Sequence, residues 1–162
     1  MTKKSNPQKE NKITAIIDTR EQTPFDLGKY MNVVNQSLPH GDYSLAYPDL
    51  RRWVCVERKS LPDFLACCTK ERARFEKELL ALRGYRFSLV VCEFKLQQVF
   101  EQQYRSQVTP ASVLASVMRW TSLGNQFIFG ENHEYSTWLV AKYLELIARD
   151  VVSFSQTSLV PK

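Results

Sequence analysis

The sequence has few of the residues that stabilise small secreted or zinc-dependent proteins. Its 162 residues include four cysteines and two histidines, and no two cysteines form a CxxC pair. This pattern disfavours a disulfide framework and a zinc site, and it favours reduced, buried thiols. No apolar run approaches the length of a membrane span, and no signal-peptide stretch opens the chain. We therefore expect an intracellular protein without a membrane partner, cytoplasmic if bacterial or phage-derived and nuclear if eukaryotic.

Glycine and proline are also scarce, with 5 and 7 residues, while 44% of the chain is hydrophobic and 24% is charged. Such a composition is ordinary for a globular domain, and the length suits one domain with a real core. We expect a disordered basic tail at residues 1–12, a single domain over residues 13–150 and a C-terminal tail over residues 151–162.

A large surplus of one charge sign is missing from most of the chain. The net charge is +5, and four lysines against one glutamate place +3 of it in the first 12 residues, which leaves +2 for the rest. One local cluster stands out between residues 70 and 86, where six basic residues face three acidic ones. The cluster fits a surface that follows nucleic-acid phosphates, and it fits a solvated helix face about as well.

Hydrophobic periodicity predicts alternating strands and helices along the chain. The predicted strands cover residues 13–18, 43–47, 53–59, 86–94 and 126–130. The predicted helices cover residues 30–38, 61–68, 70–84, 95–106, 110–124 and 134–150. Because the early strands pair through a hairpin and the later ones alternate with helices, we expect an α/β fold with a central mixed sheet flanked by helices. The aromatic residues assigned to its core are Trp53, Phe75, Trp120, Phe127, Phe129 and Trp138.

The segment WVCVERKSLPDF, residues 53–64, combines an apolar β-prone run with three consecutive charges. Because side chains alternate along a strand, Glu57 and Lys59 share one face and Arg58 points to the other. The pair lies two residues apart, roughly 6–7 Å along the backbone. Glu57 and Lys59 are therefore placed either to bracket a metal and a water or to form a plain ion pair.

A second carboxylate reaches the same place if the hairpin pairs around Asp49 and Leu50. That register sets Asp42 opposite Glu57, and a slip of one residue would turn one strand's side chains to the other face. Gly41 supplies the backbone freedom for the turn that delivers Asp42. Two converging carboxylates repel each other unless a cation lies between them, and hard oxygen ligands suit Mg²⁺ or Mn²⁺.

Together these segments resemble the XPF-family nuclease domain, from the structure-specific endonucleases of excision repair and fork processing. LPHGDYSL followed by VERKSLPDF is similar to the family's G-D…E-R-K-x-x-x-D signature, and IIDTREQTPF is similar to its D-x-R-E segment. KERARFEKEL and TPASVLASVMRW resemble two of its helices. The resemblance covers residues 13–150 and implies the restriction-endonuclease-like fold of the PD-(D/E)xK superfamily.

The resemblance also implies roles for individual residues. The catalytic set is Asp18, Asp42, Glu57 and Lys59. The metal ligands are Asp42, Glu57, Asp18 and the main-chain carbonyl of Arg58, and the cofactor is Mg²⁺, for which Mn²⁺ may substitute. Residues expected beside the site are Arg20, Glu21, Arg58 and Asp63, with the Arg58 side chain pairing with Asp63 or another acid. Residues expected on the DNA are Arg72, Arg74, Lys70 and Arg20.

The implied activity is hydrolysis of DNA phosphodiester bonds by metal-activated water, at branched, flap or junction DNA in repair, recombination or replication. We expect a small stand-alone version of the domain without helix-hairpin-helix modules. Two copies could pair as a homodimer through the exposed faces of the last two helices. The alternatives are a catalytically silent DNA-binding or scaffolding module of the same fold, and a nuclease that acts on RNA or on simple ends. His40 and His133 are assigned structural places.

Overall fold

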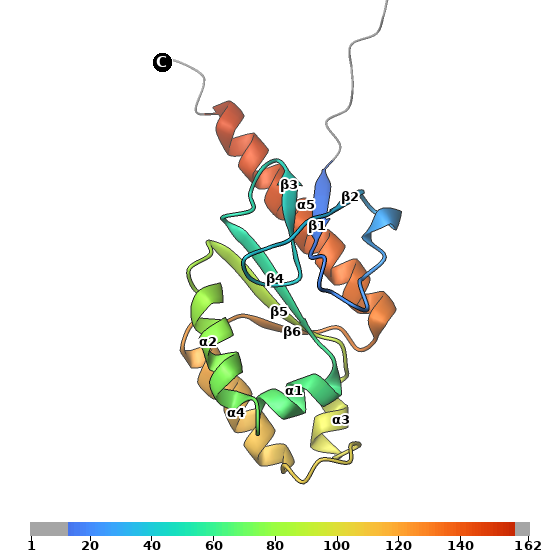
Figure 1. The fold of residues 1–162 in the computed structure, drawn as a ribbon, viewed down its shortest axis with the longest axis vertical. Coiled ribbons are helices and arrows are strands. Elements are labelled where there is room, and N and C mark those ends of the chain that lie inside the picture. The colour runs from blue at the N-terminus through green and yellow to red at the C-terminus, as the bar shows by residue number, and fades with distance from the viewer. Residues whose placement is uncertain (1–12, 158–162) are drawn as a thin grey trace, which may run out of the picture.

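The computed structural model describes residues 13–157 (Figure 1). The tail expected at residues 1–12 lies outside this range, as do residues 158–162. Six strands form one sheet in the order β2-β1-β3-β4-β5-β6. They are β1 (Thr14–Ile17), β2 (Asn32–Asn35), β3 (Tyr43–Tyr47), β4 (Val54–Lys59), β5 (Phe87–Cys92) and β6 (Phe127–Phe129). The sheet is mixed, because β3 runs antiparallel to both of its neighbours and the other pairs are parallel.

The helices flank this sheet, which confirms the expected α/β class. They are the 3₁₀ turn η1 (Leu27–Lys29), α1 (Leu61–Cys67), α2 (Arg72–Leu82), α3 (Leu96–Phe100), α4 (Pro110–Ser122) and α5 (His133–Thr157). Pro110 opens α4, where the Thr109 side chain accepts a hydrogen bond from the Ser112 N–H. Because α5 continues to Thr157, residues 151–157 lie in a helix and not in the C-terminal tail that we expected.

The helix predicted over residues 30–38 is wrong. This segment follows η1 and contains β2, an edge strand that pairs in parallel with β1. Most of its residues are exposed, because an edge strand that packs little of its surface lacks the alternation of buried and exposed residues that marks a strand in a sequence. The β-branched pair Val33 and Val34 was the available signal.

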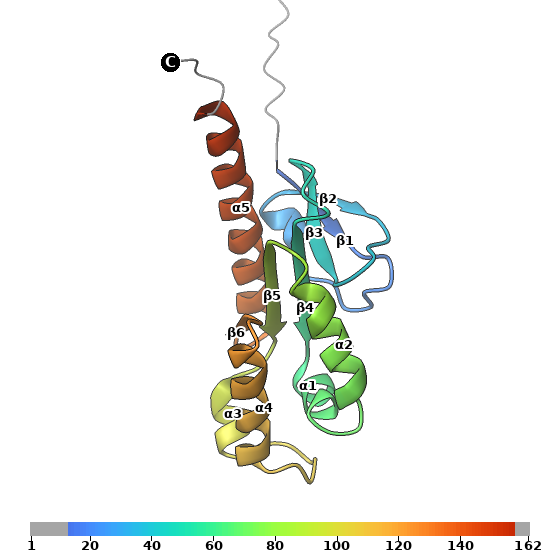
Figure 2. The same cartoon turned by 90° about the vertical axis from the view of Figure 1, so that its left-hand side faces the viewer.

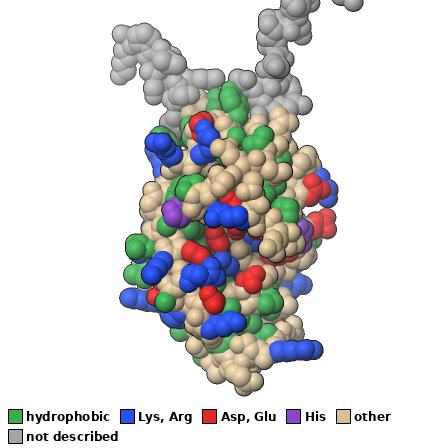
Figure 3. Space-filling model, in the orientation of Figure 1, with side chains coloured by type: hydrophobic (Ala, Val, Ile, Leu, Met, Phe, Trp, Pro, Cys, Tyr) green, Lys and Arg blue, Asp and Glu red, His purple; other side chains and the backbone are tan. Residues whose placement is uncertain are grey.

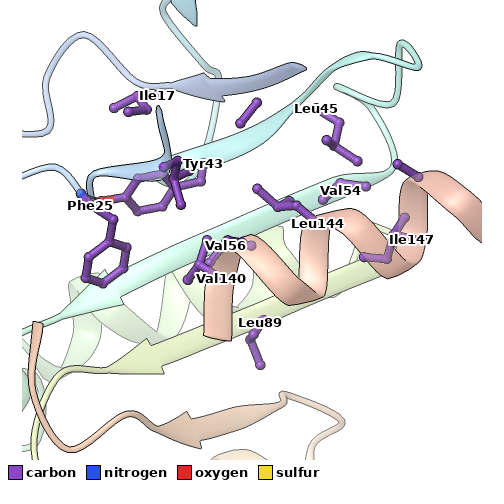
Figure 4. Close-up of a cluster of buried hydrophobic side chains, with 14 of the residues drawn as sticks. Ile17, Phe25, Tyr43, Leu45, Val54, Val56, Leu89, Val140, Leu144 and Ile147 are labelled. Atoms are coloured by element: carbon purple, nitrogen blue, oxygen red, sulfur yellow. Dashed lines mark hydrogen bonds between the residues drawn. The ribbon is translucent and has the colours of Figure 1, made fainter. Parts of the chain in front are cut away.

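Buried side chains cover both faces of the sheet. On one face, α5 packs Val140, Leu144 and Ile147 against Val54 and Val56 of β4 and their neighbours (Figure 4). On the other face, helices α1 to α4 surround a second cluster that includes Cys55, Phe64, Phe75, Leu79 and Trp120. Figure 2 shows α5 and α2 on opposite sides of the sheet. The alternation predicted for β4 is confirmed, since Cys55 faces one cluster and Val54 and Val56 face the other.

The four cysteines and the aromatic residues test the predicted core. All four cysteines are buried free thiols, as expected. Phe75 and Trp120 are buried, while Phe127 and Phe129 are half-buried. The placement of Trp53 and Trp138 in the core is wrong, because they are 46% and 49% exposed. Trp53 lies in the turn just before β4, and Trp138 lies on the outer side of α5, so neither belongs to the buried face of its element.

The sheet topology brings the ends of several strands to the same edge of the sheet. Because β3 is antiparallel to both β1 and β4, the carboxyl ends of β1 and β4 lie at the same edge as the amino end of β3. The carboxyl end of β5 joins them, since β5 is parallel to β4. Asp18, Asp42, Glu57 and Glu93 therefore all lie at this edge, although they are far apart in the sequence.

Candidate active site

The pairing of β3 and β4 has the predicted register. Tyr43 lies opposite Val56, which places Asp42 opposite Glu57. The N–H of Asp42 donates to the Val56 carbonyl at 2.8 Å, and the N–H of Asp18 donates to the Asp42 carbonyl at 2.8 Å. The main chain of Asp42 is thus held between the ends of β1 and β4.

Gly41 allows the close approach that this arrangement needs. Its φ is +70°, a left-handed conformation that a side chain disfavours. A Cβ atom at this position would lie 2.5 Å from the Sγ of Cys55 and 2.9 Å from the Val56 carbonyl oxygen. The loop that delivers Asp42 therefore lies directly on β4, and only glycine fits there.

Asp42 and Glu57 form an acidic pair with raised pKa values. Burial, and then the charge of Glu57, raises the pKa of Asp42 to about 7. One Asp42 carboxylate oxygen also accepts a hydrogen bond from the Arg58 N–H at 2.7 Å, which opposes the rise. Burial raises the pKa of Glu57 as well, against the charge of Lys59. Both carboxyls are therefore harder to ionise than they would be in water.

Lys59 supplies the positive charge next to this pair. Its Nζ lies 2.5 Å from the Oε1 of Glu57 and 3.5 Å from the Oε2 of Glu78 on α2. It also lies 5.1 Å from the centre of the Phe75 ring. Burial opposes the charged form of Lys59, but its interactions with Glu57 outweigh burial and raise its pKa. Lys59 is therefore a fixed cation in a buried position.

Asp18 lies at the same edge, and its carboxylate is bound to neighbouring protein groups. One oxygen accepts the Arg20 N–H at 2.8 Å and the Arg20 Nε at 2.7 Å, and the other accepts the Leu38 N–H at 2.5 Å. Arg20 donates a further bond to the Leu38 carbonyl at 2.7 Å. The hydrogen bond from the Arg20 side chain lowers the pKa of Asp18 despite its burial. Asp18 and Arg20 thus tie the loop around Leu38 to the end of β1.

The Arg58 side chain points to the opposite face, as alternation predicts, and it pairs with acidic residues other than Asp63. It pairs with Glu93 at 2.5 Å and with Glu21 at 3.5 Å. Glu93 in turn contacts the Nδ1 of His133 at 2.8 Å. Asp63 makes no pair with Arg58; its carboxylate accepts a hydrogen bond from the Ser60 hydroxyl at the start of α1.

The basic residues expected on DNA are spread over α2 and its surroundings. The Arg72 side chain is 39% exposed and is held by its neighbours, because it donates to the Ser116 hydroxyl at 2.8 Å, pairs with Glu76 at 3.0 Å and lies over the Trp120 ring. Arg74 is more exposed and pairs with Glu78 at 2.8 Å. Lys70 is exposed and lines a separate hollow beside α1. Arg20 is the member of the expected set that lies at the acidic pair.

A cleft of about 370 Å³ opens over the acidic pair. Its walls are Asp18, Arg20, Pro39, His40, Gly41, Asp42, Glu57, Glu78 and Leu82. Acidic and basic side chains gather side by side near the middle of this face of the molecule (Figure 3). Sequence reasoning missed Glu78, although there was a signal. Glu78 lies three residues after Phe75 and four before Leu82, so it interrupts the apolar stripe of α2.

The donor set of the cleft fits a hard divalent cation. Within residues 13–157, no three His, Cys, Asp or Glu side chains form a metal-binding cluster. The side-chain donors are therefore the pair Asp42 and Glu57, and a main-chain carbonyl would have to add to them. Such oxygen ligands, together with waters, suit Mg²⁺ or Mn²⁺. Burial is the main cause of the raised pKa values of both carboxyls, and a cation bound between them would favour their ionised forms.

The comparisons with known proteins identify one family model and solved structures of the same fold. The family model of the ERCC4 domain matches residues 17–142. Among solved structures, XPF from Aeropyrum pernix matches with a TM-score of 0.66 and 19% identity, over 82% of this chain and 60% of that chain. XPF from Aeropyrum pernix in complex with DNA matches with a TM-score of 0.67 and 18% identity, over 85% of this chain and 66% of that chain. No curated protein matches the sequence significantly. The chain thus spans about two thirds or less of the length of the XPF chains that share its fold.

Proposed function

Since the chain belongs to the ERCC4 domain family of XPF-type nucleases, we propose that it is a metal-dependent endonuclease that hydrolyses DNA. The observation that carries the proposal is that Asp42 and Glu57 line one open cleft, with the buried Lys59 ammonium in contact with Glu57. Two carboxylates next to a buried cation match the needs of phosphodiester hydrolysis, in which charge must be balanced on a phosphate.

Asp42 and Glu57 would hold Mg²⁺ or Mn²⁺, with the Arg58 carbonyl as a further ligand, and Asp18 would stay beside it. Such an ion would neutralise phosphate charge and make water more acidic. The Arg58 N–H orients Asp42 through its 2.7 Å hydrogen bond. The Lys59 ammonium would orient the attacking water and balance the charge that develops on the phosphate.

The reaction itself is a balanced hydrolysis. The oxygen of water forms a bond to phosphorus, the bond from phosphorus to one ester oxygen breaks, and the released oxygen takes up a proton. No covalent protein intermediate is needed. Arg20 lines the cleft and is 66% exposed, so it would contact a phosphate there, and Arg74 and Lys70 would contact the backbone farther out.

A cleavage assay with several substrates tests this proposal. The protein is incubated with flap, fork, single-stranded and duplex DNA and with RNA, in Mg²⁺, Mn²⁺ or EDTA. We expect cleavage of branched, flap or junction DNA with either ion and none in EDTA. Glu57→Gln and Lys59→Met should each lower the rate by about 100-fold or more. Glu101→Gln is the control, since Glu101 is exposed and hydrogen-bonds only to Gln97 and Gln103 on α3 and just after it.

The same assay separates the alternatives. Intact DNA binding without metal-dependent cutting of any substrate would replace the enzyme with a silent DNA-binding module. Cutting of RNA but not DNA would change the substrate class.

Pairing of two copies remains a further part of the proposal. The outer sides of α4 and α5 expose Met118, Tyr135, Trp138 and Leu146, and large exposed apolar side chains are typical of association surfaces. Sedimentation equilibrium should give the mass of a dimer that Trp138→Glu converts to a monomer. A monomeric wild-type protein would contradict the pairing.

A further inference from the structure

A second hollow lies beside the cleft, on the other side of the loop that contains Pro39. It has a volume of about 510 Å³, and its walls come from residues 36–39 and from the turn between β3 and β4. Pro39 lines both hollows. Arg20 on the wall of the cleft holds the neighbouring Leu38 carbonyl at 2.7 Å. The two hollows are therefore separated by one loop and open next to each other.

This second hollow has an aromatic wall and an excess of positive charge. Trp53 lines it and is 46% exposed. Arg86 lies 5.5 Å from the centre of the Trp53 ring and makes no ion pair within residues 13–157. Arg52 lines the hollow and makes no ion pair within the same residues, whereas Arg51 pairs with Asp49 at 2.7 Å. Arg86 thus lies over the indole ring, and Arg51 and Arg52 line the same hollow together with one carboxylate, that of Asp49.

We propose that this hollow, called here the Trp53 groove, binds an unpaired DNA strand that continues from the cleft. The inference rests on the proposed function, because it takes the cleft to hold the phosphate that is cut. An exposed indole offers a flat surface on which any base can stack, and guanidinium groups bind the phosphates on either side. Arg52 and Arg86 are held in no ion pair within residues 13–157, so they would supply those contacts.

The distance between the two sites sets the position of the stacked base. Trp53 lies in the turn just before β4 and four residues before Glu57, a separation of at most about 13 Å at the rise of a strand. That span corresponds to about four nucleotides if the unpaired bases stay stacked at the 3.4 Å spacing of a duplex strand, and to fewer if the strand is extended. The loop at Gly41 crosses between them over Cys55. The groove therefore selects substrates with unpaired nucleotides within about four positions of the cut.

Tryptophan fluorescence can follow this contact without any cleavage. Trp120 is 1% exposed, so in a Trp138→Phe background Trp53 is the one solvent-exposed indole. Titration with a short oligo-dT in EDTA should quench its fluorescence, and Trp53→Phe in the same background should remove the quenching. Trp53→Ala should weaken binding of oligo-dT by about 5- to 100-fold, the effect of losing one stacked base. Phe100→Ala, which removes another exposed aromatic ring at the end of α3, is the control and should bind like the wild type.

The arginines have their own test. The double variant Arg52→Ala with Arg86→Ala should lower the salt dependence of oligo-dT binding by about 1.4 in the log–log slope, because each phosphate contact with a single strand contributes about 0.7. Arg105→Ala removes an exposed arginine from the loop between α3 and α4, and it should leave the slope unchanged.

Three outcomes would overturn the Trp53 groove: no quenching by oligo-dT, equal affinity of Trp53→Ala and the wild type, or quenching by oligo-U alone, which would assign the surface to RNA. These measurements are made in EDTA and so do not depend on catalysis. A protein that binds oligo-dT through Trp53 but cuts nothing keeps the groove and loses the nuclease. A protein that cuts DNA but binds oligo-dT without the help of Trp53 keeps the nuclease and loses the Trp53 groove.

Discussion

The carboxyl group of Asp42 lies beside that of Glu57 at the edge of the sheet, where burial raises its pKa to about 7. A hydrogen bond from the Arg58 N–H fixes its orientation. The fold therefore holds two like charges together, and the cost of ionising them falls on the folded state alone. This cost makes the stability of the protein depend on pH and on divalent cations in a way that can be measured.

The pH dependence follows from the direction of the Asp42 shift. The unfolded chain loses the Asp42 proton near the ordinary value of 3.8, whereas the folded protein keeps it up to about pH 7. Between these values the folded state binds more protons, so this group makes the free energy of unfolding fall as the pH rises. Asp42→Asn removes the effect. In EDTA, the free energy of unfolding of Asp42→Asn should rise by roughly 1–3 kcal/mol relative to that of the wild type between about pH 5 and pH 8. Urea unfolding measures this difference.

A divalent cation should reverse the loss. Mg²⁺ that binds Asp42 and Glu57 in the folded state stabilises it as the concentration rises above the dissociation constant. We expect Mg²⁺ to raise the melting temperature more at about pH 8 than at about pH 5, since protons compete for the same oxygens. Asp42→Asn should lose most of this rise. Equal shifts in wild type and Asp42→Asn would place the ion elsewhere.

Gly41 offers a test of how tightly the loop lies on β4. Gly41→Ala adds a Cβ atom 2.5 Å from the Cys55 Sγ at a φ of +70°. Gly124→Ala is the control for the backbone, because its φ is +91° but the added Cβ would meet only the Arg83 Cδ at 4.0 Å. We expect Gly124→Ala to lower the free energy of unfolding by about 1 kcal/mol and Gly41→Ala by clearly more. Similar losses would mean that the loop can move away from β4.

At this scale, the sequence predicted the residues of the acidic pair better than their surroundings. Alternation and register are local rules, and they placed Glu57, Lys59 and Asp42 on one face before any coordinates were known. Partners from distant segments follow no such rule. Arg58 and Glu93 lie 35 positions apart in the sequence. The sequence predicted that Arg58 forms an ion pair with an acid, but it did not identify Glu93 as that acid.

At the scale of elements, Arg58 joins the ends of three segments behind the cleft. It pairs with Glu93 just after β5 and with Glu21 in the loop after β1, and its guanidinium lies 5.6 Å from the centre of the Phe25 ring. All three charged side chains are largely buried, so the removal of one partner leaves a charge without compensation.

Glu93→Gln tests this pairing. It should lower the free energy of unfolding by roughly 2–4 kcal/mol, because the buried guanidinium keeps only its longer contact with Glu21. Glu131→Gln is the matched control, since its pair with Lys95 spans 3.9 Å with both side chains 53% exposed, and it should change stability by less than about 1 kcal/mol. A loss no larger than that of the control would show that Arg58 does not need Glu93.

The elements that sequence reasoning found share strong local signals. Pro110 and Gly124 mark the ends of α4. The apolar run of β5 is long enough to predict a strand without help from neighbouring segments. β2 was missed because it forms at an edge, where pairing with β1 and not burial makes it a strand. Trp53 was misplaced because hydrophobicity does not tell whether a side chain at a strand's start is covered.

At the scale of the whole molecule, one sheet separates two hydrophobic clusters and carries the cleft at its edge. Residues of β4 enter both clusters, Val54 and Val56 on the α5 side and Cys55 on the other. The acidic pair lies at the end of this same strand. The position of Asp42 relative to Glu57 therefore depends on both clusters, and the loss of either cluster should disturb the position of the acidic pair.

This shared strand predicts that the molecule unfolds as one unit. Leu144→Ala removes a fully buried side chain from the α5 side and should cost about 2–5 kcal/mol. Trp120 lies in the opposite cluster, so its fluorescence in a Trp53→Phe, Trp138→Phe background reports on the other side of the sheet. The midpoints of Trp120 fluorescence and of far-ultraviolet circular dichroism should shift together in urea. If the Trp120 midpoint stayed while the dichroism shifted, the two clusters would be independent, and β4 would not couple α5 to the cleft.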